Sequence, residues 1–278
     1  MSIRKLFLNS ISIGILAIMA LVMSLPFIWM FSTSLKSFDQ VFAYPPEFIL
    51  KNFYWSNYSE AWKSASFDRY FFNSTFTTVA ILLLQLACAI PAAYAFARLR
   101  FKGEKYLFLM ILATMMIPIQ VTFIPNFLII KQFGWFNSYI GLIVPFSANA
   151  FGIFLIRQAF MQVPKEMDEA AKLDGCSHLQ IIRHVMVPLS GAAIVTFILF
   201  SFIWHYNDFF WPIIATNREE LRTLQVGLSS MITQEGGKSG TQWNVIMAAS
   251  SIVIFPLLII FIFLQKYMVK GIATTGMK

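Results

Sequence analysis

A short polar segment holds the residues of this chain that are best suited to a specific contact with another protein. It reads EAAKLDG over residues 169–175, and VMVP follows at residues 185–188. A carboxylate such as Glu169 accepts charge-assisted hydrogen bonds from basic groups. The small side chains of Ala170 and Ala171 would let a second surface approach closely. Because the flanking sequence is strongly apolar, this segment is where a partner protein would act on the chain.

The same segment carries the signals of two short helices joined by a tight turn. Pro164 suits the first position of a helix, and the helix dipole favours acidic residues in the same first turn. Gly175 can end that helix in a left-handed conformation. Ser177 and Gln180 have the spacing of a capping box, which would begin a second helix leading to Pro188. The sequence therefore predicts a helix, a turn and a helix.

No set of residues with catalytic or metal-binding spacing accompanies this segment. His178 and His184 lie six residues apart, which is not the spacing of a metal-binding pair. Cys88 and Cys176 are too few for a metal site, and their positions do not suggest a disulfide. The chain also lacks the Gly-x-Ser-x-Gly and His-Glu-x-x-His motifs. We therefore expect no enzyme activity, no metal site and no cofactor bound by this chain.

The elements that carry the polar segment are predicted to lie in a membrane. The chain is 58% hydrophobic and 12% charged, whereas soluble domains carry about 25% charged residues. Six uncharged windows reach the ~20 residues that a helix needs to cross the hydrocarbon layer. The expected fold is an all-α membrane protein, a single domain of residues 1–278 with six transmembrane helices. The predicted spans are 11–33, 70–97, 106–130, 138–156, 186–207 and 243–265.

The distribution of basic residues predicts the orientation of these spans. With both termini in the cytoplasm, thirteen of the 21 Lys and Arg residues lie on the inner side. This arrangement obeys the positive-inside rule and places the net charge of +8 on the inner face. The basic balance therefore reflects membrane topology rather than nucleic-acid binding. The polar loop of residues 157–184 then faces the cytoplasm between the fourth and fifth spans.

The centres of the predicted spans contain no Asp, Glu, Lys or Arg. Ion-coupled carriers usually keep such groups, although each costs at least ~2.5–3.5 kcal/mol to place in the membrane. The absence of these charged residues argues against a carrier that is driven by an ion gradient. Carbonyl and hydroxyl oxygens can also hold Na⁺, so an ion-coupled secondary transporter stays open as an alternative.

Several motifs together resemble one family of transport proteins. The EAA triplet, Gly175 and the Val-x-Val-Pro run have the spacing of the EAA loop in permeases of ATP-binding-cassette (ABC) importers. Val185 and Val187 stand where the usual pattern has Ile and Leu. AAYAFAR at 92–98, MIP at 116–118 and NDF at 207–209 are similar to the sugar-importer branch, close to the MalG-type subunit. Tyr206 departs from that branch, which usually has Trp there.

The resemblance implies a permease subunit that moves a sugar or sugar-like solute across a bacterial or archaeal cytoplasmic membrane by ATP-driven alternating access. The implied partners are a second, MalF-like permease subunit, two ABC ATPase subunits that bind ATP and Mg²⁺, an extracellular solute-binding protein and the lipid bilayer. The loop of residues 157–184 would contain a coupling helix seated on the ATPase. Its implied contact residues are Glu169, Ala170, Ala171, Asp174, Gly175 and Pro188. A non-sugar ABC permease is a second alternative.

Polar side chains within or near the spans are candidates for contact with a solute. These candidates are Gln120, Asn126, Asn149, Asn207 and Asp208. Hydrogen bonding between helices is the alternative role for polar groups at such positions. For His205 and Asp208, the alternative is that they pair with each other or with a partner subunit near the membrane surface.

Two predicted outer loops, residues 36–69 and 208–238, are long. The first is rich in aromatic residues and is expected to form short helices at the membrane surface. The second ends in Gly236, Gly237 and Lys238, which are candidates for contact with the binding protein. A plain flexible loop is an equal alternative. This run is not a phosphate-binding loop, because Ile232 occupies the position where that motif requires glycine.

Overall fold

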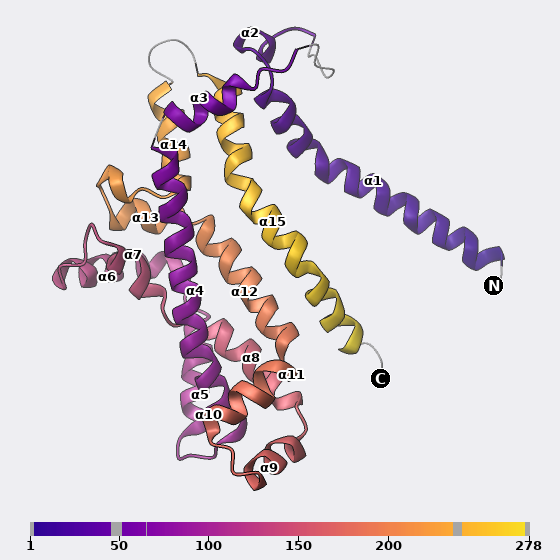
Figure 1. The fold of residues 1–278 in the computed structure, drawn as a ribbon, viewed down its shortest axis with the longest axis vertical. Helices are drawn as coiled ribbons and strands as arrows, with labels where there is room; N and C mark the ends of the chain where they lie inside the picture. Colours follow the sequence, from indigo (N-terminus) through magenta and orange to yellow (C-terminus); the bar gives the residue numbers. More distant parts are fainter. Residues whose placement is uncertain (1–2, 46–51, 65, 236–240, 276–278) are drawn as a thin grey trace. The chain divides into compact units, whose positions relative to one another are not determined.

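The computed structural model describes residues 3–45, 52–64, 66–235 and 241–275, and these residues form helices with no β-strand (Figure 1). The predicted all-α class is therefore confirmed. The chain divides into two compact units. Unit 1 contains residues 1–67 and 228–255, and unit 2 contains residues 68–227 and 256–278.

Three helices are each long and apolar enough to cross a membrane. They are α1 (Ile3–Ser34), α4 (Phe67–Arg98) and α15 (Trp243–Thr275). Continuous helices suit these apolar stretches because a helix satisfies all of its backbone hydrogen bonds internally. Three more spans arise only if each of three bent helix pairs is counted as one, so the described residues contain three to six apolar spans.

The first two bent pairs are interrupted near prolines. Helices α5 (Glu104–Thr114) and α6 (Ile119–Gln132) meet at 98°, and Pro118 lies between them. The segment formed by α7 (Tyr139–Ile143) and η1 (Val144–Phe146) meets α8 (Ala150–Gln162) at 43°. Proline disfavours a helical conformation in the preceding residue, which explains why a helix stops before Pro118. The predicted spans 106–130 and 138–156 are therefore each built from helices of different direction.

The third bend lies in the predicted span 186–207. Helix α10 (His178–Ile181) continues through the π-helical segment η2 (Ile182–Met186) into α11 (Val187–Leu189). After Ser190 the chain turns by 83° into α12 (Gly191–Tyr206). Only α12 supplies the apolar length of this span, and α10 to α11 run in a different direction.

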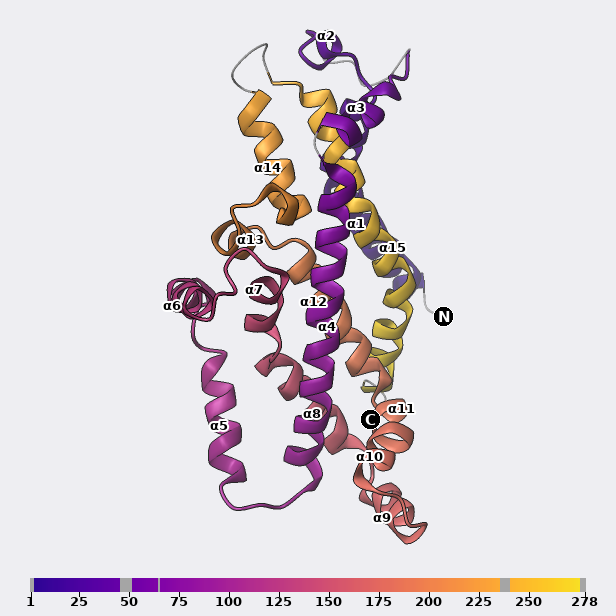
Figure 2. The same cartoon turned by 60° about the vertical axis from the view of Figure 1, so that its left-hand side comes forward.

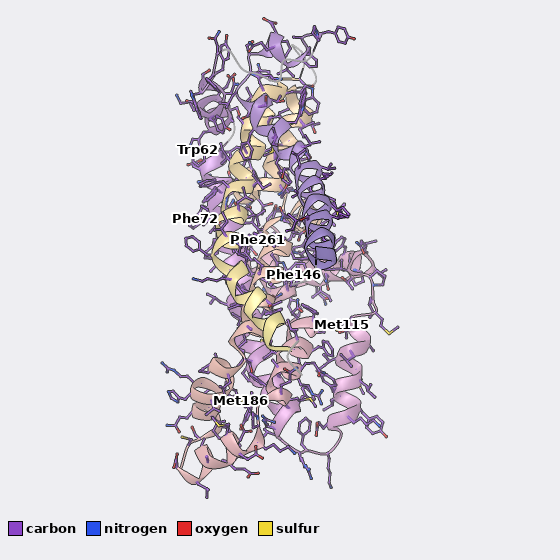
Figure 3. All side chains as sticks on the ribbon, turned by 90° about the vertical axis from the view of Figure 1, so that its right-hand side faces the viewer. Trp62, Phe72, Met115, Phe146, Met186 and Phe261 are labelled. Carbon is purple, nitrogen blue, oxygen red and sulfur yellow. The ribbon has the colours of Figure 1, made fainter. Side chains whose placement is uncertain are left out.

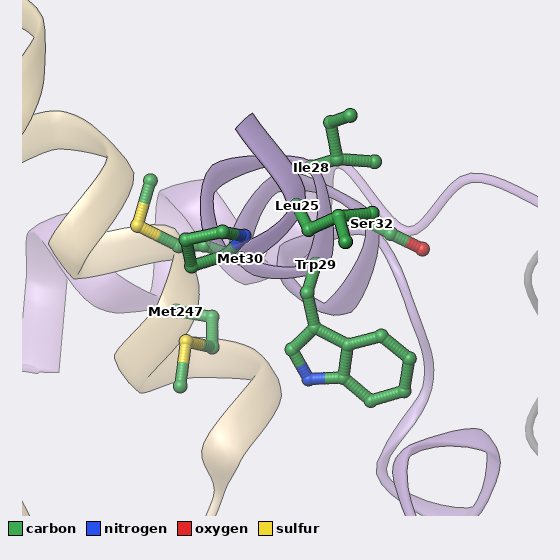
Figure 4. Close-up of a pocket in the computed structure, with 7 residues that line it drawn as sticks. Leu25, Ile28, Trp29, Met30, Ser32 and Met247 are labelled. Carbon is green, nitrogen blue, oxygen red and sulfur yellow. The ribbon is translucent and has the colours of Figure 1, made fainter. Parts of the chain in front are cut away.

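Unit 1 contains two short helices in the first long loop, α2 (Phe38–Val41) and α3 (Ser56–Ser64). The buried amide of Asn57 ties α3 to the end of α1, because its Nδ2 atom donates to the carbonyls of Ser34 and Lys36 at 2.9 and 2.8 Å. Its Oδ1 atom accepts from Asn244 Nδ2 at 3.0 Å, which adds the start of α15. An apolar cleft of about 500 Å³ in this unit is lined by α1 residues and Met247 (Figure 4).

The core of unit 2 joins α4, α8, α9 (Lys165–Leu173), α10 with η2, and α12. Gly152 of α8 allows close packing on α12, because a Cβ atom there would lie 2.6 Å from the Phe197 ring. Figures 1 and 2 show α9, α10 and the turn between α4 and α5 at the same end of this unit. Met186 lies nearer that end than Phe146 does (Figure 3).

The second long loop of unit 2 packs on the other end of α4. It contains α13 (Phe210–Ala215), η3 (Glu219–Leu221) and the start of α14 (Leu224–Glu235). The fully buried Asn73 donates through Nδ2 to the carbonyls of Glu220 and Arg222, at 2.8 Å each. Its Oδ1 atom accepts from the Tyr139 hydroxyl at 2.6 Å. One asparagine therefore connects α4, α7 and η3.

Candidate functional site

Helix α9 and the turn after it lie where the sequence predicted them, except that the helix begins at Lys165 rather than at Pro164. Pro164 directly precedes the helix, and Gly175 follows it with φ +79°. The Cys176 N–H donates to the Ala171 carbonyl, and the Gly175 N–H donates to the Lys172 carbonyl, both at 3.0 Å. These two bonds form a Schellman motif, which satisfies the last carbonyls of a helix. The helix therefore ends at a defined residue.

The second helix also begins as its sequence predicted. The side chain of Ser177 accepts from the Gln180 N–H, and Gln180 Oε1 accepts from the Ser177 N–H at 2.7 Å. This reciprocal pair is a capping box. Together with Gly175, it holds α9 and α10 in one rigid, sharply turned unit.

The two faces of α9 differ in what surrounds them. Asp168 and Ala171 are buried, whereas Glu169 and Ala170 are exposed and Leu173 is 89% exposed. Asp174 and Pro188, also predicted contact residues, are exposed. Only one of the two alanines therefore offers a surface to a partner. Ala171 packs in the core instead, because adjacent residues on a helix point in different directions.

A buried ion pair fixes the inner face of α9 to the last residue of α4. Arg98 Nε lies 2.7 Å from Asp168 Oδ2, and the two side chains are 6% and 5% exposed. Arg98 also donates to the Val163 carbonyl just before α9. Burial raises the pKa of the Asp168 carboxyl, and the nearby Arg98 guanidinium opposes this effect. Sequence reasoning missed this pair, because Arg98 and Asp168 are distant in the sequence and no local pattern links them.

One further contact attaches the same segment to α4, and contacts of Arg157 join α8 to α4 and α5. The Tyr94 hydroxyl of α4 lies 3.0 Å from His178 Nδ1 of α10. Arg157 of α8 donates through Nε to the Phe96 carbonyl at 3.0 Å, and its guanidinium lies 4.1 Å from the centre of the Phe108 ring. A displacement of α9 would therefore act directly on α4.

A second feature of unit 2 is an open cavity of about 730 Å³. It is bordered by α4, the α5–α6 bend, η1, α8 and α12. Two of the predicted solute contacts, Asn126 and Asn149, line it. Gln120 is exposed and does not line the cavity, and neither do Asn207 and Asp208.

Gln85 organises the polar side of this cavity. Its Nε2 atom donates to the Phe146 carbonyl at 2.9 Å, and its Oε1 atom accepts from the Ser201 hydroxyl at 2.6 Å. A carbonyl only accepts hydrogen bonds, so the nitrogen of the Gln85 amide must face Phe146. The same nitrogen lies 3.1 Å from His205 Nε2, which therefore acts as an acceptor in a neutral imidazole.

The remaining predicted contact residues lie away from this network. Asn207 Oδ1 accepts from Gln225 Nε2 at 3.1 Å, and Asp208 Oδ1 accepts from the Trp211 N–H at 3.3 Å. His205 pairs with Gln85 rather than with Asp208, so the suggested pairing of His205 with Asp208 was wrong. Gly236, Gly237 and Lys238 lie outside the described residues.

Neither feature resembles a metal centre. Within residues 3–45, 52–64, 66–235 and 241–275, no cluster of three or more His, Cys, Asp or Glu side chains is arranged to hold a metal ion.

Unit 2 combines bent apolar helices with a capped helical segment at one end. Known transporters share this combination. Residues 85–274 match the model of the family described as "binding-protein-dependent transport system inner membrane component". The chain belongs to this family. It is therefore a multi-pass component of the cytoplasmic membrane.

Related permeases support the same assignment. The chain is 31% identical over 278 residues to the probable ABC transporter permease protein YurM of Bacillus subtilis, covering 99% of this chain and 91% of the relative. It is 32% identical over 239 residues to the sn-glycerol-3-phosphate transport system permease protein UgpE of Yersinia enterocolitica, covering 84% of each.

Solved structures agree with this fold. A chain of a bacterial ABC transporter involved in the import of the acidic polysaccharide alginate superimposes with a TM-score of 0.85 at 28% identity, covering 96% of this permease and 98% of that chain. A chain from a bacterial alginate ABC transporter in complex with an alginate pentasaccharide-bound periplasmic protein has a TM-score of 0.66 at 16% identity, over 94% and 93% of the chains. The second likeness concerns the fold alone.

These findings confirm the function expected from the EAA motif. The chain is the permease subunit of an ABC importer and is not an enzyme, since ATP hydrolysis belongs to separate subunits. As its description says, transport by systems of this family depends on a binding protein. Membership of this family decides against an ion-coupled secondary transporter.

Proposed function

We propose that this permease moves a sugar or sugar-like solute across the cytoplasmic membrane of a bacterium or archaeon. The names of its relatives support this solute class, because they refer to sn-glycerol 3-phosphate and to the polysaccharide alginate. The complete importer would contain a second permease subunit, two ABC ATPase subunits that bind ATP and Mg²⁺, and an extracellular solute-binding protein.

The orientation follows from the distribution of charge. Both termini and the segment of α9 and α10 would face the cytoplasm, where an excess of Lys and Arg is favoured. The outer loop that contains Gly236, Gly237 and Lys238 would then face the binding protein.

In this arrangement α9 is the helix that receives force from the ATPases. Glu169, Ala170 and Asp174 form its exposed contact surface, and Glu169 would accept a charge-assisted hydrogen bond from a basic group of the ATPase. The single observation that carries the proposal is the buried Arg98–Asp168 pair, which attaches the opposite face of α9 to α4. A helix held on one side and exposed on the other can transmit movement without unfolding.

The transport cycle would proceed by alternating access. Closure of the ATPase dimer on ATP would move α9, and the contacts of Arg98 and Tyr94 would pass that motion to α4. Rearrangement of the bent helices would open the cavity lined by Asn126 and Asn149 to one side of the membrane at a time. Hydrolysis would return the helices to the starting state.

A charge reversal at Glu169 tests this proposal. The complex with its co-purified subunits is reconstituted in proteoliposomes, and solute uptake and ATP hydrolysis are both measured. We expect Glu169→Lys to abolish uptake driven by ATP while the permease stays folded. Glu60→Lys makes the same charge change on the exposed surface of α3 and is expected to transport normally. Normal uptake by Glu169→Lys would contradict the coupling role.

A further inference from the structure

Two relatives are named for anionic solutes, but the described lining of the cavity in unit 2 contains no basic side chain. We infer that it accepts an uncharged carbohydrate and excludes phosphorylated and acidic sugars. This inference rests on the proposed function and narrows its substrate class.

The described lining of the cavity carries no formal charge. None of the 18 described residues that line it is Asp, Glu, Lys or Arg. The lining His205 is neutral, because its Nε2 atom accepts from the Gln85 amide. An anionic solute would lose its hydration on entering and would find no opposite charge there, which is strongly unfavourable.

Neutral hydrogen-bonding groups are available in the cavity. The carboxamide of Asn126 makes no hydrogen bond to any other part of the chain that the structure describes. Asn149 uses its Oδ1 atom to accept from the Gly152 N–H at 3.0 Å, which leaves its NH₂ group to donate. A carboxamide both donates and accepts, so it matches the hydroxyl groups of a sugar without requiring charge.

Exposed aromatic rings form the apolar part of the lining. Phe151, Phe200 and Trp204 are 38%, 52% and 59% exposed. Phe151 and Phe200 meet edge to face, with their ring centres 6.3 Å apart. Sugar rings present C–H faces that pack on aromatic side chains, while a few polar groups fix their orientation. Exposed aromatic rings beside free carboxamides form the environment that a neutral carbohydrate needs.

The solutes named for two relatives can be compared with the lining of this cavity. These solutes are sn-glycerol 3-phosphate and the acidic polysaccharide alginate, which are anions. Recognition of a phosphate or carboxylate typically uses Arg, Lys or clustered N–H donors. The described lining of this cavity contains neither basic side chain. This permease therefore has the same fold as these relatives but takes a solute of different charge.

The test uses the complete importer, with its second permease, ATPases and binding protein, in proteoliposomes. ATP-dependent uptake is compared for neutral probes (maltotriose, cellobiose and raffinose) and anionic probes (sn-glycerol 3-phosphate and triguluronate). We expect uptake of at least one neutral probe to exceed that of each anion at least tenfold. Asn126→Leu should lower this uptake about tenfold, as expected for lost hydrogen bonds to the solute.

Gln132→Leu is the control, since it also replaces a carboxamide with leucine, at an exposed position of α6 outside the cavity. It should transport like the unmodified chain. Trp204→Leu is a second cavity variant and should also lower uptake, while the thermal midpoint of the complex stays unchanged. Uptake of an anion equal to that of the neutral probes, or normal uptake by both cavity variants, would overturn the inference. Uptake of no probe at all would overturn the proposed function as well.

Discussion

Arg98 and Asp168 join the last residue of α4 to the buried face of α9 through a contact of 2.7 Å between Nε and Oδ2. Both side chains are almost completely buried. In such pairs the loss of hydration largely offsets the attraction, but removing one partner leaves an uncompensated buried charge. The pair therefore enforces a connection between the two helices more than it adds net stability.

Single substitutions at this pair are expected to be costly. Arg98→Met or Asp168→Leu should each lower the free energy of unfolding by about 3–5 kcal/mol, the range found when one partner of a buried pair is removed. The measurement is denaturant unfolding of the permease in detergent. Arg100→Met is the control, because Arg100 is exposed and a surface change of this kind stays within about 0.5 kcal/mol.

The double variant Arg98→Met with Asp168→Leu separates the charge from the packing. Replacing a whole buried pair with apolar side chains is often neutral, so we expect most of the lost stability to return. Additive losses in the double variant would show that the two side chains do not interact.

The turn after α9 depends on the left-handed conformation of Gly175. Gly175→Ala should lower the free energy of unfolding by about 1–2 kcal/mol, because a Cβ atom is unfavourable at φ +79°. No neighbouring atom of the described residues lies within 4 Å of that Cβ position, so the effect is conformational rather than a clash. Gly175→Asn should cost less, since asparagine tolerates this region.

Gly191→Ala is the matched control for this turn. Gly191 also has open space around it and lacks a left-handed backbone, so alanine at this helix start should leave stability unchanged or raise it by up to about 1 kcal/mol. Equal thermal midpoints for Gly175→Ala and Gly191→Ala would contradict the role given to the turn.

Close packing of α8 on α12 predicts sensitivity at Gly152. A methyl group there would lie 2.6 Å from the Phe197 ring, and such overpacking typically costs about 1–3 kcal/mol. Gly152→Ala should therefore lower the thermal midpoint, and Phe197→Leu in the same chain should recover part of it by making room. An unchanged midpoint for Gly152→Ala would mean that the two helices separate without cost.

The Gln85 amide connects α4, η1 and α12 within the membrane-spanning part. Gln85→Leu leaves the Phe146 carbonyl and the Ser201 hydroxyl without this partner, and should cost about 1–2 kcal/mol in detergent unfolding. Thr196→Val is the control, because among the described residues the Thr196 hydroxyl bonds only to Ala192 of its own helix. If both variants unfold alike, Gln85 does not hold these elements together.

Local features of this permease were readable from its sequence because their determinants lie within a few residues of one another. Uncharged apolar windows predict helices, since a membrane admits few other structures. Gly175 and the Ser177–Gln180 pair predicted the turn and the second helix start, because caps involve contacts three or four residues apart. The EAA spacing led to the family for the same reason, since it lies within one short segment.

Tertiary structure alone decided how these elements meet. The pairing of Arg98 with Asp168 and the network around Gln85 join residues that are distant in sequence. Which of two adjacent alanines faces the core, and which amides line the cavity, depends on the rotation and bending of whole helices. Those rotations are set by packing between helices, and a local pattern along one helix carries no information about the surface of its neighbour.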